Sequence, residues 1–237
     1  FKNILTTNRV KIPFGVAQIG KAFRNEITPK QFLFRMREFE QMEIEWFCHE
    51  NDAMKFFEFW SSHRLEFYKT IGIKQENIRL RPHERDELAH YSTCCTDVEY
   101  QFPFGWKEME GIAHRGTFDL SSHSKQSGKD LAVFDDVTKS SYTPTVIECS
   151  VGTDRSFLML LFDAYCEDVL EGEVRTVLKL APTVAPIKAA LLPLTKKQIE
   201  PAMRLYADLQ KLGVHIDFDE SGSIGKRYRR HDEIGTP

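Results

Sequence analysis

Residues 35–46 alternate between two kinds of side chain with the two-residue period of a β-strand. A shorter alternation covers residues 23–27, where Arg24 and Glu26 share a face, and residues 28–31 between the two have the chemistry of a turn, with a proline. We therefore predict two antiparallel strands with one apolar, buried face and one charged face. The charged face carries Arg35, Arg37, Phe39, Gln41, Glu43 and Glu45. An exposed strand pair would alternate too, but exposed faces favour Lys and Glu, whereas three arginines with a ring favour an anion-binding surface.

The next segments alternate between helical and extended patterns. Residues 51–70 predict a helix with an aromatic stripe, capped by Asn51 or Asp52 and ended by Gly72. Residues 78–81 predict a strand, and residues 83–91 a short helix with a solvated, charged face. Residues 96–102 and 105–112 predict a hairpin, in which regular alternation would place Glu108 and Glu110 on one face. Two such carboxylates repel each other unless a cation lies between them, and Mg²⁺ would suit.

Residues 121–139 are polar, and residues 122–129 within them predict a loop. Residues 143–150 predict a strand in which Glu148 and Ser150 share a face. A glycine turn at Gly152 then leads into a helix predicted over residues 155–171. A helix N-terminus favours anions, and a cation in the first turn opposes the helix dipole. Arg155 in that first turn therefore indicates a ligand.

The pattern changes after Gly172. Residues 177–180, 189–194 and 214–218 predict short strands, and a capping box of Thr195 and Gln198 begins a helix that ends before Gly213. Strand, helix and strand at this spacing predict a parallel α/β unit and a second domain. The chain then reaches a basic cluster with an aromatic ring, which could grip phosphate and stack on a base or could be a solvated loop. Its candidate RNA-binding residues are Lys226, Arg227, Tyr228 and Arg229.

Composition supports an ordinary globular protein. The 237 residues are 41% hydrophobic and 28% charged, with a net charge of −3, which excludes a uniformly basic nucleic-acid coat. The part from residue 173 on carries 11 Lys and Arg against 8 Asp and Glu, whereas the preceding part carries 21 against 27. No signal peptide or membrane span is predicted. The five cysteines form no CxxC pair, so we expect reduced thiols in the cytoplasm and no zinc. We interpret both ends of the sequence as cuts through a longer protein.

Two motifs resemble those of a known family. Phe23–Arg24–Asn25–Glu26, a loop and then Arg35, Arg37, Glu38 and Phe39 resemble motif 2 of the class II aminoacyl-tRNA synthetases, and residues 152–155 (Gly-Thr-Asp-Arg) resemble their motif 3. Residues 41–45, 105–115, 146–150 and 222–235 are similar to the dimeric glycyl-tRNA synthetases. The resemblance implies an α+β fold: a class II antiparallel sheet with flanking helices in residues 1–175, then a smaller α/β anticodon-binding domain, truncated, in residues 176–237.

The resemblance also implies an activity: glycine is activated with ATP to glycyl-adenylate and transferred to the 3′ end of tRNA(Gly). Arg24 and Arg155 would be catalytic, Arg24 on the α-phosphate and Arg155 covering adenine and reaching the γ-phosphate. Phe39 would stack under adenine, Glu26 would orient the adenine edge or the tRNA acceptor end, and Glu108 would hold Mg²⁺ or a nucleotide hydroxyl. The implied ATP-binding residues are Arg24, Asn25, Glu26, Phe34, Arg35, Arg37, Phe39, Glu108, Met109, Gly152 and Arg155. No organic prosthetic group is implied.

Glycine binding is implied for Phe39, Gln41, Glu43, Arg115, Glu148 and Ser150. Glu43, Glu148 and Ser150 would surround the ammonium, and Arg115 would lie near the carboxylate. A substrate without a side chain can be selected only through its charged ends, so buried carboxylates suit this task. The implied partners are glycine, tRNA(Gly) and, in the full-length protein, a second copy as homodimer, with no membrane.

Two departures from the family pattern bear on activity. The family's motif 1 and the last strands and helix of its anticodon domain are absent from these 237 residues, so we expect them alone to adenylate glycine poorly or not at all. Two alternatives stay open: a catalytically silent synthetase-like nucleic-acid-binding module, and a class II synthetase for another small amino acid. Retention of both Arg24 and Arg155 argues against the first, and Glu43 with Glu148 and Ser150 argues against the second.

Overall fold

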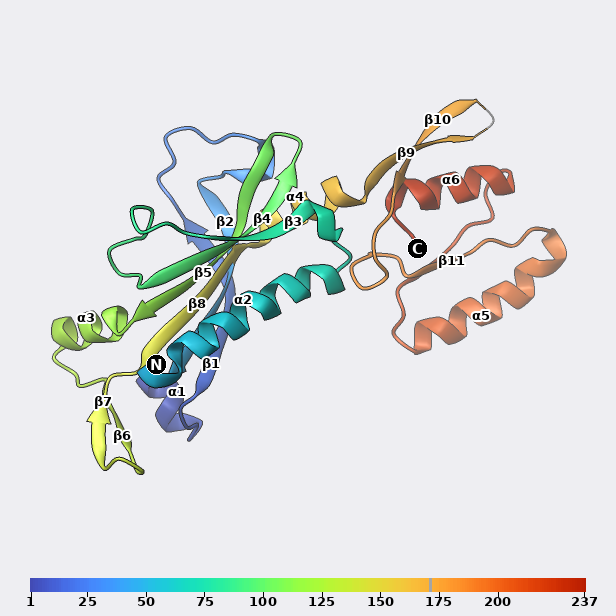
Figure 1. Cartoon of the computed structure of the whole chain (residues 1–237). Helices are drawn as coiled ribbons and strands as arrows, with labels where there is room; N and C mark the ends of the chain where they lie inside the picture. The colour runs from blue at the N-terminus through green and yellow to red at the C-terminus, as the bar shows by residue number, and fades with distance from the viewer. Residues whose placement is uncertain (171) are drawn as a thin grey trace. The chain divides into compact units, whose positions relative to one another are not determined.

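The computed structural model describes residues 1–170 and 172–237, which form two compact units (Figure 1). Residues 1–67 and 75–158 make the first unit, and residues 68–74 and 159–237 make the second. The boundary expected at residue 175 lies inside a strand of the second unit. The assignment of residues 1–175 and 176–237 to two domains stays a prediction.

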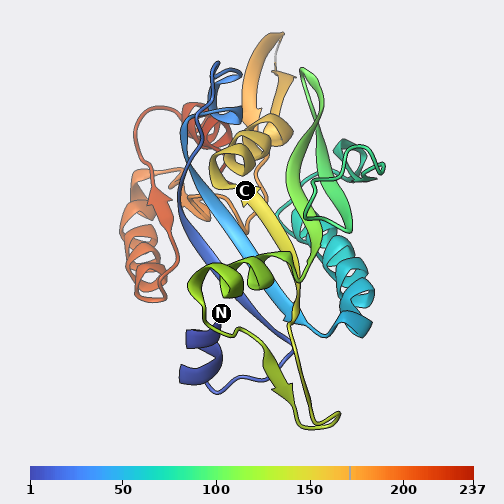
Figure 2. The same cartoon turned by 90° about the vertical axis from the view of Figure 1, so that its left-hand side faces the viewer.

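The first unit is built on one six-stranded sheet, whose face is seen in Figure 2. Its strands are β1 (Phe14–Phe23), β2 (Glu38–Cys48), β3 (Ile78–Pro82), β4 (Cys94–Phe102), β5 (Gly105–Gly116) and β8 (Thr145–Gly152). They lie in the order β1-β2-β8-β5-β4-β3, and every neighbouring pair is antiparallel. The centre of the sheet therefore brings together β2, β8 and β5, which are far apart in the sequence.

The predicted strand pair in residues 23–46 is confirmed in part. β2 is one of its strands. Its partner β1 ends at Phe23, however, so residues 24–27, which were expected to be a strand, belong to the loop that follows. A loop with the short 3₁₀ helix η1 (Phe32–Phe34) connects the strands, and Gln31 and Phe32 have positive φ. The backbone N–H of Arg24 donates to the carbonyl of Arg37 at 2.9 Å and so closes this loop at its base.

One face of the sheet packs against α2 (Ala53–Thr70), which confirms the aromatic helix; the short 3₁₀ helix η2 (Glu50–Asp52) precedes it. Trp46 of β2 contacts Phe56 and Trp60 of α2, with ring centroids 5.3 and 5.5 Å apart. At the N-terminus, Phe1 precedes α1 (Lys2–Thr7) and packs with Phe14 and Phe47. α2 covers the apolar face of β2. The aromatic cluster lies on the opposite face, beyond the polar set, because Phe47 is two residues from Glu45 and therefore shares its face.

A β-bulge in β5 overturns the expected pairing of carboxylates. Glu99 of β4 faces Glu108, but the preceding Val98 faces Glu110, so Met109 is an extra residue in β5. The bulge turns Glu110 toward α2, where its carboxylate is 1% exposed and lies 2.6 Å from Nε of Arg64. Glu108 stays exposed on the opposite side. The two glutamates therefore do not share a face, and no cation is needed between them.

Two further predictions in the first unit are wrong. Residues 83–91 form turns and irregular chain instead of a helix, because His83, Glu87 and Arg81 are engaged with neighbouring side chains rather than spaced on one helical face. Most of the loop predicted over residues 122–129 is helical, because α3 (Phe118–Ser127) buries Leu120 and ends at Gly128 with φ +68°. The short hairpin of β6 (Val133–Asp135) and β7 (Ser140–Tyr142) follows it.

The longer segment of the second unit begins within α4 (Thr153–Ala164). This helix ends earlier than expected. Residues 165–170 alternate in burial and form β9 (Tyr165–Leu170), which pairs with β10 (Glu173–Leu178) in an antiparallel hairpin. Residue 171, the last of the helix predicted over residues 155–171, lies outside the described residues. β-Branched and aromatic residues within this segment favour a strand once a partner strand is available.

The parallel α/β unit is confirmed. β11 (Ala189–Leu191) and β12 (Ile216–Phe218) pair in parallel, and α5 (Ile199–Lys211) connects them after the 3₁₀ turn η4 (Lys196–Gln198). The capping box of Thr195 and Gln198 is present. The basic cluster lies on α6 (Ile224–Ile234) and is therefore helical rather than a loop.

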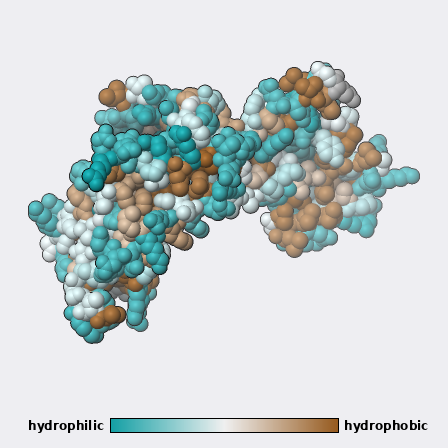
Figure 3. Space-filling view, in the orientation of Figure 1, coloured by the Kyte–Doolittle hydropathy of each residue, from teal (hydrophilic) through white to brown (hydrophobic). Residues whose placement is uncertain are grey.

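Figure 3 shows mostly polar side chains on the visible face of the first unit, with apolar patches between them. None of the helices in residues 1–170 and 172–237 has the length and apolar character needed to cross a bilayer.

Candidate active site

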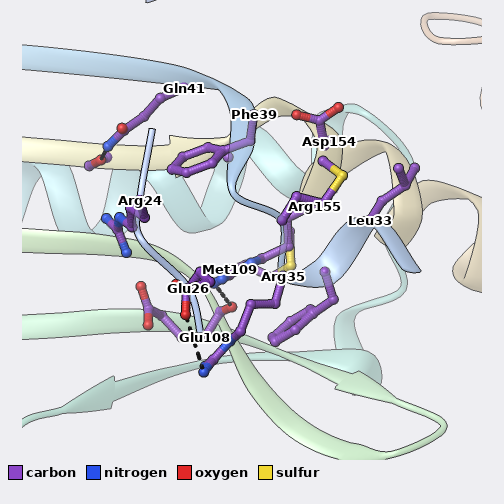
Figure 4. A pocket seen from close by; sticks show the side chains of 14 residues that line it. Arg24, Glu26, Leu33, Arg35, Phe39, Gln41, Glu108, Met109, Asp154 and Arg155 are labelled. Atoms are coloured by element: carbon purple, nitrogen blue, oxygen red, sulfur yellow. Dashed lines mark hydrogen bonds and ion pairs between the residues drawn. The ribbon is translucent and has the colours of Figure 1, made fainter. Parts of the chain in front are cut away.

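The charged face of the sheet, together with the loop after β1, surrounds a cavity of about 150 Å³ in the first unit (Figure 4). The loop contributes Arg24, Glu26 and residues around η1, β2 contributes Phe39 and Gln41, and β5 contributes Glu108. The start of α4 closes the cavity with Arg155. Nine of the predicted ATP-binding residues line it: Arg24, Glu26, Phe34, Arg35, Phe39, Glu108, Met109, Gly152 and Arg155.

Two arginine side chains lie against aromatic rings in this cavity. The guanidinium carbon of Arg155 is 4.3 Å from the centroid of Phe34, and that of Arg24 is 5.6 Å from the centroid of Phe39. Nη1 of Arg155 also donates to the backbone carbonyl of Glu108 at 2.7 Å. Burial lowers the pKa of Arg155, and the charges of Arg24 and Arg35 act in the same direction. Several positive charges are thus held close together, which stabilises a bound anion.

The structure separates Arg35 from Arg37. Nη1 of Arg35 lies 3.9 Å from the carboxylate of Glu26, at the cavity. Arg37 instead donates to the backbone carbonyls of Glu26 and Ile27, at 2.8 and 3.3 Å, and so holds the shape of the loop. Arg37 and Asn25 are not among the described residues lining the cavity.

A second cavity of about 230 Å³ adjoins the first and shares Arg24, Glu108 and Ser150 with it. Glu148 lies in its wall. Strand register explains the grouping, because Glu43 is directly opposite Ser150 across β2 and β8. Nε2 of Gln41 donates to Oε1 of Glu43 at 2.8 Å and to Oγ of Ser150 at 2.5 Å. Gln41, Glu43, Glu148 and Ser150 are therefore brought together as predicted.

Arg115 is held by carboxylates. Its guanidinium donates twice to Asp119, at 2.6 and 2.9 Å, and Nη1 lies 3.0 Å from Oε2 of Glu148. The ring of Tyr91 covers it at 4.2 Å. The hydrogen bonds that Arg115 donates to Asp119, together with the charge of Glu148, raise the pKa of Arg115, so it stays charged. This geometry makes Arg115 a support for Glu148.

Glu45 was on the predicted charged face but was not predicted as a site residue. It is directly opposite Glu148 in the β2–β8 pairing. Burial, the charge of Glu148 and the hydrogen bond between the two carboxyls raise the pKa of Glu45 to about 8. Burial also raises the pKa of Glu148, although Arg115 opposes this shift. Both shifts favour the protonated form of the pair.

Sequence reasoning missed the far wall of the second cavity. That wall comes from residues 83–97, of which residues 83–91 were predicted as a helix with a solvated, charged face. His83, Cys95 and Asp97 place three potential metal-ligand atoms within 4.8 Å of one another. Nε2 of His83 lies 2.8 Å from Oδ2 of Asp97, and burial raises the pKa of the Cys95 thiol to about 12. The lining residues not predicted are Leu33, Met36 and Asp154 in the first cavity and His83, Glu87, Ala89, Tyr91, Ser92, Cys95, Asp97, Gly111 and Ala113 in the second.

Comparison with known families identifies the architecture. Residues 1–167 match the model of the tRNA synthetase class II core domain (G, H, P, S and T), and residues 188–237 match the anticodon binding domain model. The chain belongs to the class II tRNA synthetases. The predicted class II antiparallel sheet with flanking helices, followed by an α/β anticodon-binding domain, is confirmed.

Individual proteins that are similar to this chain are also aminoacyl-tRNA synthetases. It is 54% identical to a glycine–tRNA ligase of Caldanaerobacter subterraneus subsp. tengcongensis over 237 residues, and 53% identical to one of Geobacillus thermodenitrificans over 238. Each match covers all of this chain and 51% of the relative, so the chain spans about half the length of these curated relatives. A crystal structure of prolyl-tRNA synthetase from Cryptosporidium parvum, complexed with L-proline and AMP, has a TM-score of 0.68 at 16% identity. That match covers 95% of this chain and 47% of the other, and shows the fold.

Proposed function

We propose that this chain carries the ATP and glycine sites of a glycine–tRNA ligase and part of its tRNA-binding surface. The observation that carries the proposal is the junction of the two cavities: a cationic, aromatic cavity meets a carboxylate-lined one at Arg24, Glu108 and Ser150. ATP and an amino acid bound in adjoining cavities would place a carboxylate next to the α-phosphate. The identity to glycine–tRNA ligases supports glycine as that amino acid.

The first step would be attack of the glycine carboxylate oxygen on the α-phosphorus. A phosphorus–oxygen bond forms, the bond to the β-phosphate oxygen breaks, and pyrophosphate leaves with the negative charge. Arg24 would stabilise charge on the α-phosphate, and Arg155 would hold the distal phosphates. The rings of Phe34 and Phe39, already against these arginines, would keep the guanidinium groups in place before ATP arrives. Catalysis would then rest on positioning and preorganised charge, without a protein nucleophile.

Glu148 in the wall of the second cavity and Glu43, which is directly opposite Ser150, would hold the ammonium of glycine. Glu43 and Glu148 supply charge, and Ser150 supplies a hydroxyl oxygen. Gln41 and Arg115 fix this set, Gln41 by bonding Glu43 and Ser150, and Arg115 by bonding Glu148. Substrates that bring a side chain would have to displace groups that are already bonded to each other, which favours the smallest amino acid.

Mg²⁺ is implied by this use of ATP. Glu108 is an exposed carboxylate that lines both cavities, so it fits an ion held jointly with phosphate oxygens. When bound, the ion would reduce the negative charge of the phosphates. We infer no zinc and no organic prosthetic group in this function.

The anticodon-binding family match supports tRNA contact by the second unit. On α6, Lys226, Tyr228 and Arg229 are exposed and we keep them as RNA-binding candidates. Arg227 is 8% exposed, and its guanidinium donates to the carbonyls of Pro193 at 2.7 Å and Gly222 at 2.8 Å. It therefore supports the fold of the unit instead of reaching RNA. The family resemblance supports a homodimer, and the five free cysteines fit a reducing cytoplasm.

The test is amino-acid-dependent ATP–pyrophosphate exchange by the natural protein at its full length, with glycine, alanine and serine compared. We expect exchange with glycine and little with the other two. Arg24→Ala should lower the rate by about 10²–10³, the usual loss when one charge-stabilising donor is removed. Arg204→Ala, an exposed arginine of the second unit paired with Glu200, is the matched control and should retain the wild-type rate.

Preference for alanine or serine would assign the site to another amino acid. Binding of tRNA without exchange for any amino acid would favour a silent RNA-binding module. Wild-type exchange in Arg24→Ala would remove the proposed role of the arginine cavity.

A further inference from the structure

Acidic groups outnumber basic groups around Glu45, which is directly opposite Glu148 in the wall of the second cavity. Glu43 lies on the same strand, Glu148 faces Glu45 from β8, and the cation that reaches them is Arg115 of β5. Arg115 is itself shared with Asp119. On the other side, β1 places the uncharged Val16 opposite Glu45. Among the described residues, four carboxyl groups thus compete for one guanidinium, which Tyr91 covers.

A proton relieves this imbalance in the empty site. Glu45 and Glu148 are directly opposite residues of an antiparallel pair, which places two carboxyl groups side by side, and two ionised carboxylates in such positions repel each other. Arg115 stabilises the ionised form of Glu148 through an ion pair at 3.0 Å, whereas Glu45 has no ion pair among the described residues, so Glu45 is the member that holds the proton. The pKa of Glu45, raised to about 8, agrees with this assignment.

An ammonium group arriving at Glu43 and Glu148 would replace the missing positive charge. A cation within about 4–6 Å favours the ionised form of a carboxyl group, so the proton on Glu45 would be held less tightly. We propose that Glu45 is a positioning residue that exchanges its proton for the ammonium of the amino acid: the empty site holds the proton between Glu45 and Glu148, and binding releases it to solvent. This inference rests on the proposed glycine site.

The exchange is measurable by calorimetric titration of glycine, without ATP, into the natural protein at full length. Titrations at pH 7 in phosphate and in Tris, whose ionisation enthalpies differ, give the number of protons released. We expect close to one proton, because a group with a pKa near 8 is roughly nine-tenths protonated at pH 7. The affinity for glycine should rise with pH, by up to about tenfold per unit below pH 8, and then become constant.

Glu45→Gln keeps the shape and an N–H donor toward Glu148 but cannot ionise. This variant should bind glycine without releasing a proton and with an affinity that does not change between pH 6.5 and 8. Glu58→Gln, an exposed position of α2, is the matched control and should release as many protons as the wild type.

Glycine binding by the wild type with the same heat in both buffers would overturn the inference while leaving the glycine site intact. Equal proton release by Glu45→Gln and wild type would show that another group carries the proton. Absence of glycine binding by the wild type would overturn the proposed function, and this inference with it. The wild-type titration decides the matter even if Glu45→Gln fails to fold.

Discussion

Because of the β-bulge at Met109, we expect Glu108 and Glu110, two residues apart in the sequence, to differ strongly in their contribution to stability. Glu110 is 1% exposed and pairs with Arg64, which is 12% exposed, at 2.6 Å. Glu110→Ala takes this carboxylate from a guanidinium that is mostly desolvated, and removing one partner of such a pair costs about 3–5 kcal/mol. Glu108→Ala removes an exposed carboxylate, and the free energy of unfolding should change by less than about 0.5 kcal/mol.

Tryptophan fluorescence is a suitable probe, because all three tryptophans, Trp46, Trp60 and Trp106, belong to the first unit. With an m-value of about 1–3 kcal/mol per molar urea, Glu110→Ala should lower the unfolding midpoint by about 1 M or more. The double variant Arg64→Met with Glu110→Met should recover much of the loss, since apolar replacement of a buried pair is often neutral. Equal effects of Glu108→Ala and Glu110→Ala would mean that β5 alternates regularly and has no bulge.

Three further outcomes are expected. Arg227→Ala should destabilise the second unit by about 2–3 kcal/mol in thermal unfolding, because it removes charged donors from two carbonyls. Lys226→Ala should leave the stability unchanged, and equal melting of the two variants would contradict the burial of Arg227. Lys226→Ala should instead weaken tRNA binding and reduce its salt dependence in a filter-binding assay. Cys95 should react with iodoacetamide at pH 8 far more slowly than free cysteine, since burial raises its pKa to about 12; mass spectrometry that finds rapid labelling would refute this.

Local patterns predicted most of the elements that the structure contains. The alternation in residues 35–46 placed Gln41, Glu43 and Glu45 on one face, and the capping box marked the start of the helix after Thr195. Such signals are carried by neighbouring residues, so sequence alone reveals them. The motif 2 and motif 3 resemblance then brought distant segments together, which no local pattern could do.

The wrong predictions share a cause, namely dependence on distant partners. The strand at residues 165–170 forms because β10 pairs with it, and a helical pattern had been extended over it instead. The wall at residues 83–97 depends on ion pairs such as that of Arg81 with Glu87, across an irregular turn. A dense run of charged residues has the same composition whether its side chains are solvated or form ion pairs beside a cavity. Composition therefore could not distinguish a solvated helix from a cavity wall.

The bulge is the clearest example of information that periodicity lacks, and it also determines which carboxylates line the cavity. In a regular strand, Glu108 and Glu110 would share a face, and two carboxylates would crowd the proposed phosphate cavity, where the arginines must hold an anion. The extra residue Met109 rotates Glu110 to the other side, where it balances Arg64. The cavity then keeps one exposed carboxylate, Glu108, at its junction with the second cavity. One inserted residue thus gives two identical side chains separate tasks, stability for Glu110 and the proposed contact with ATP and Mg²⁺ for Glu108.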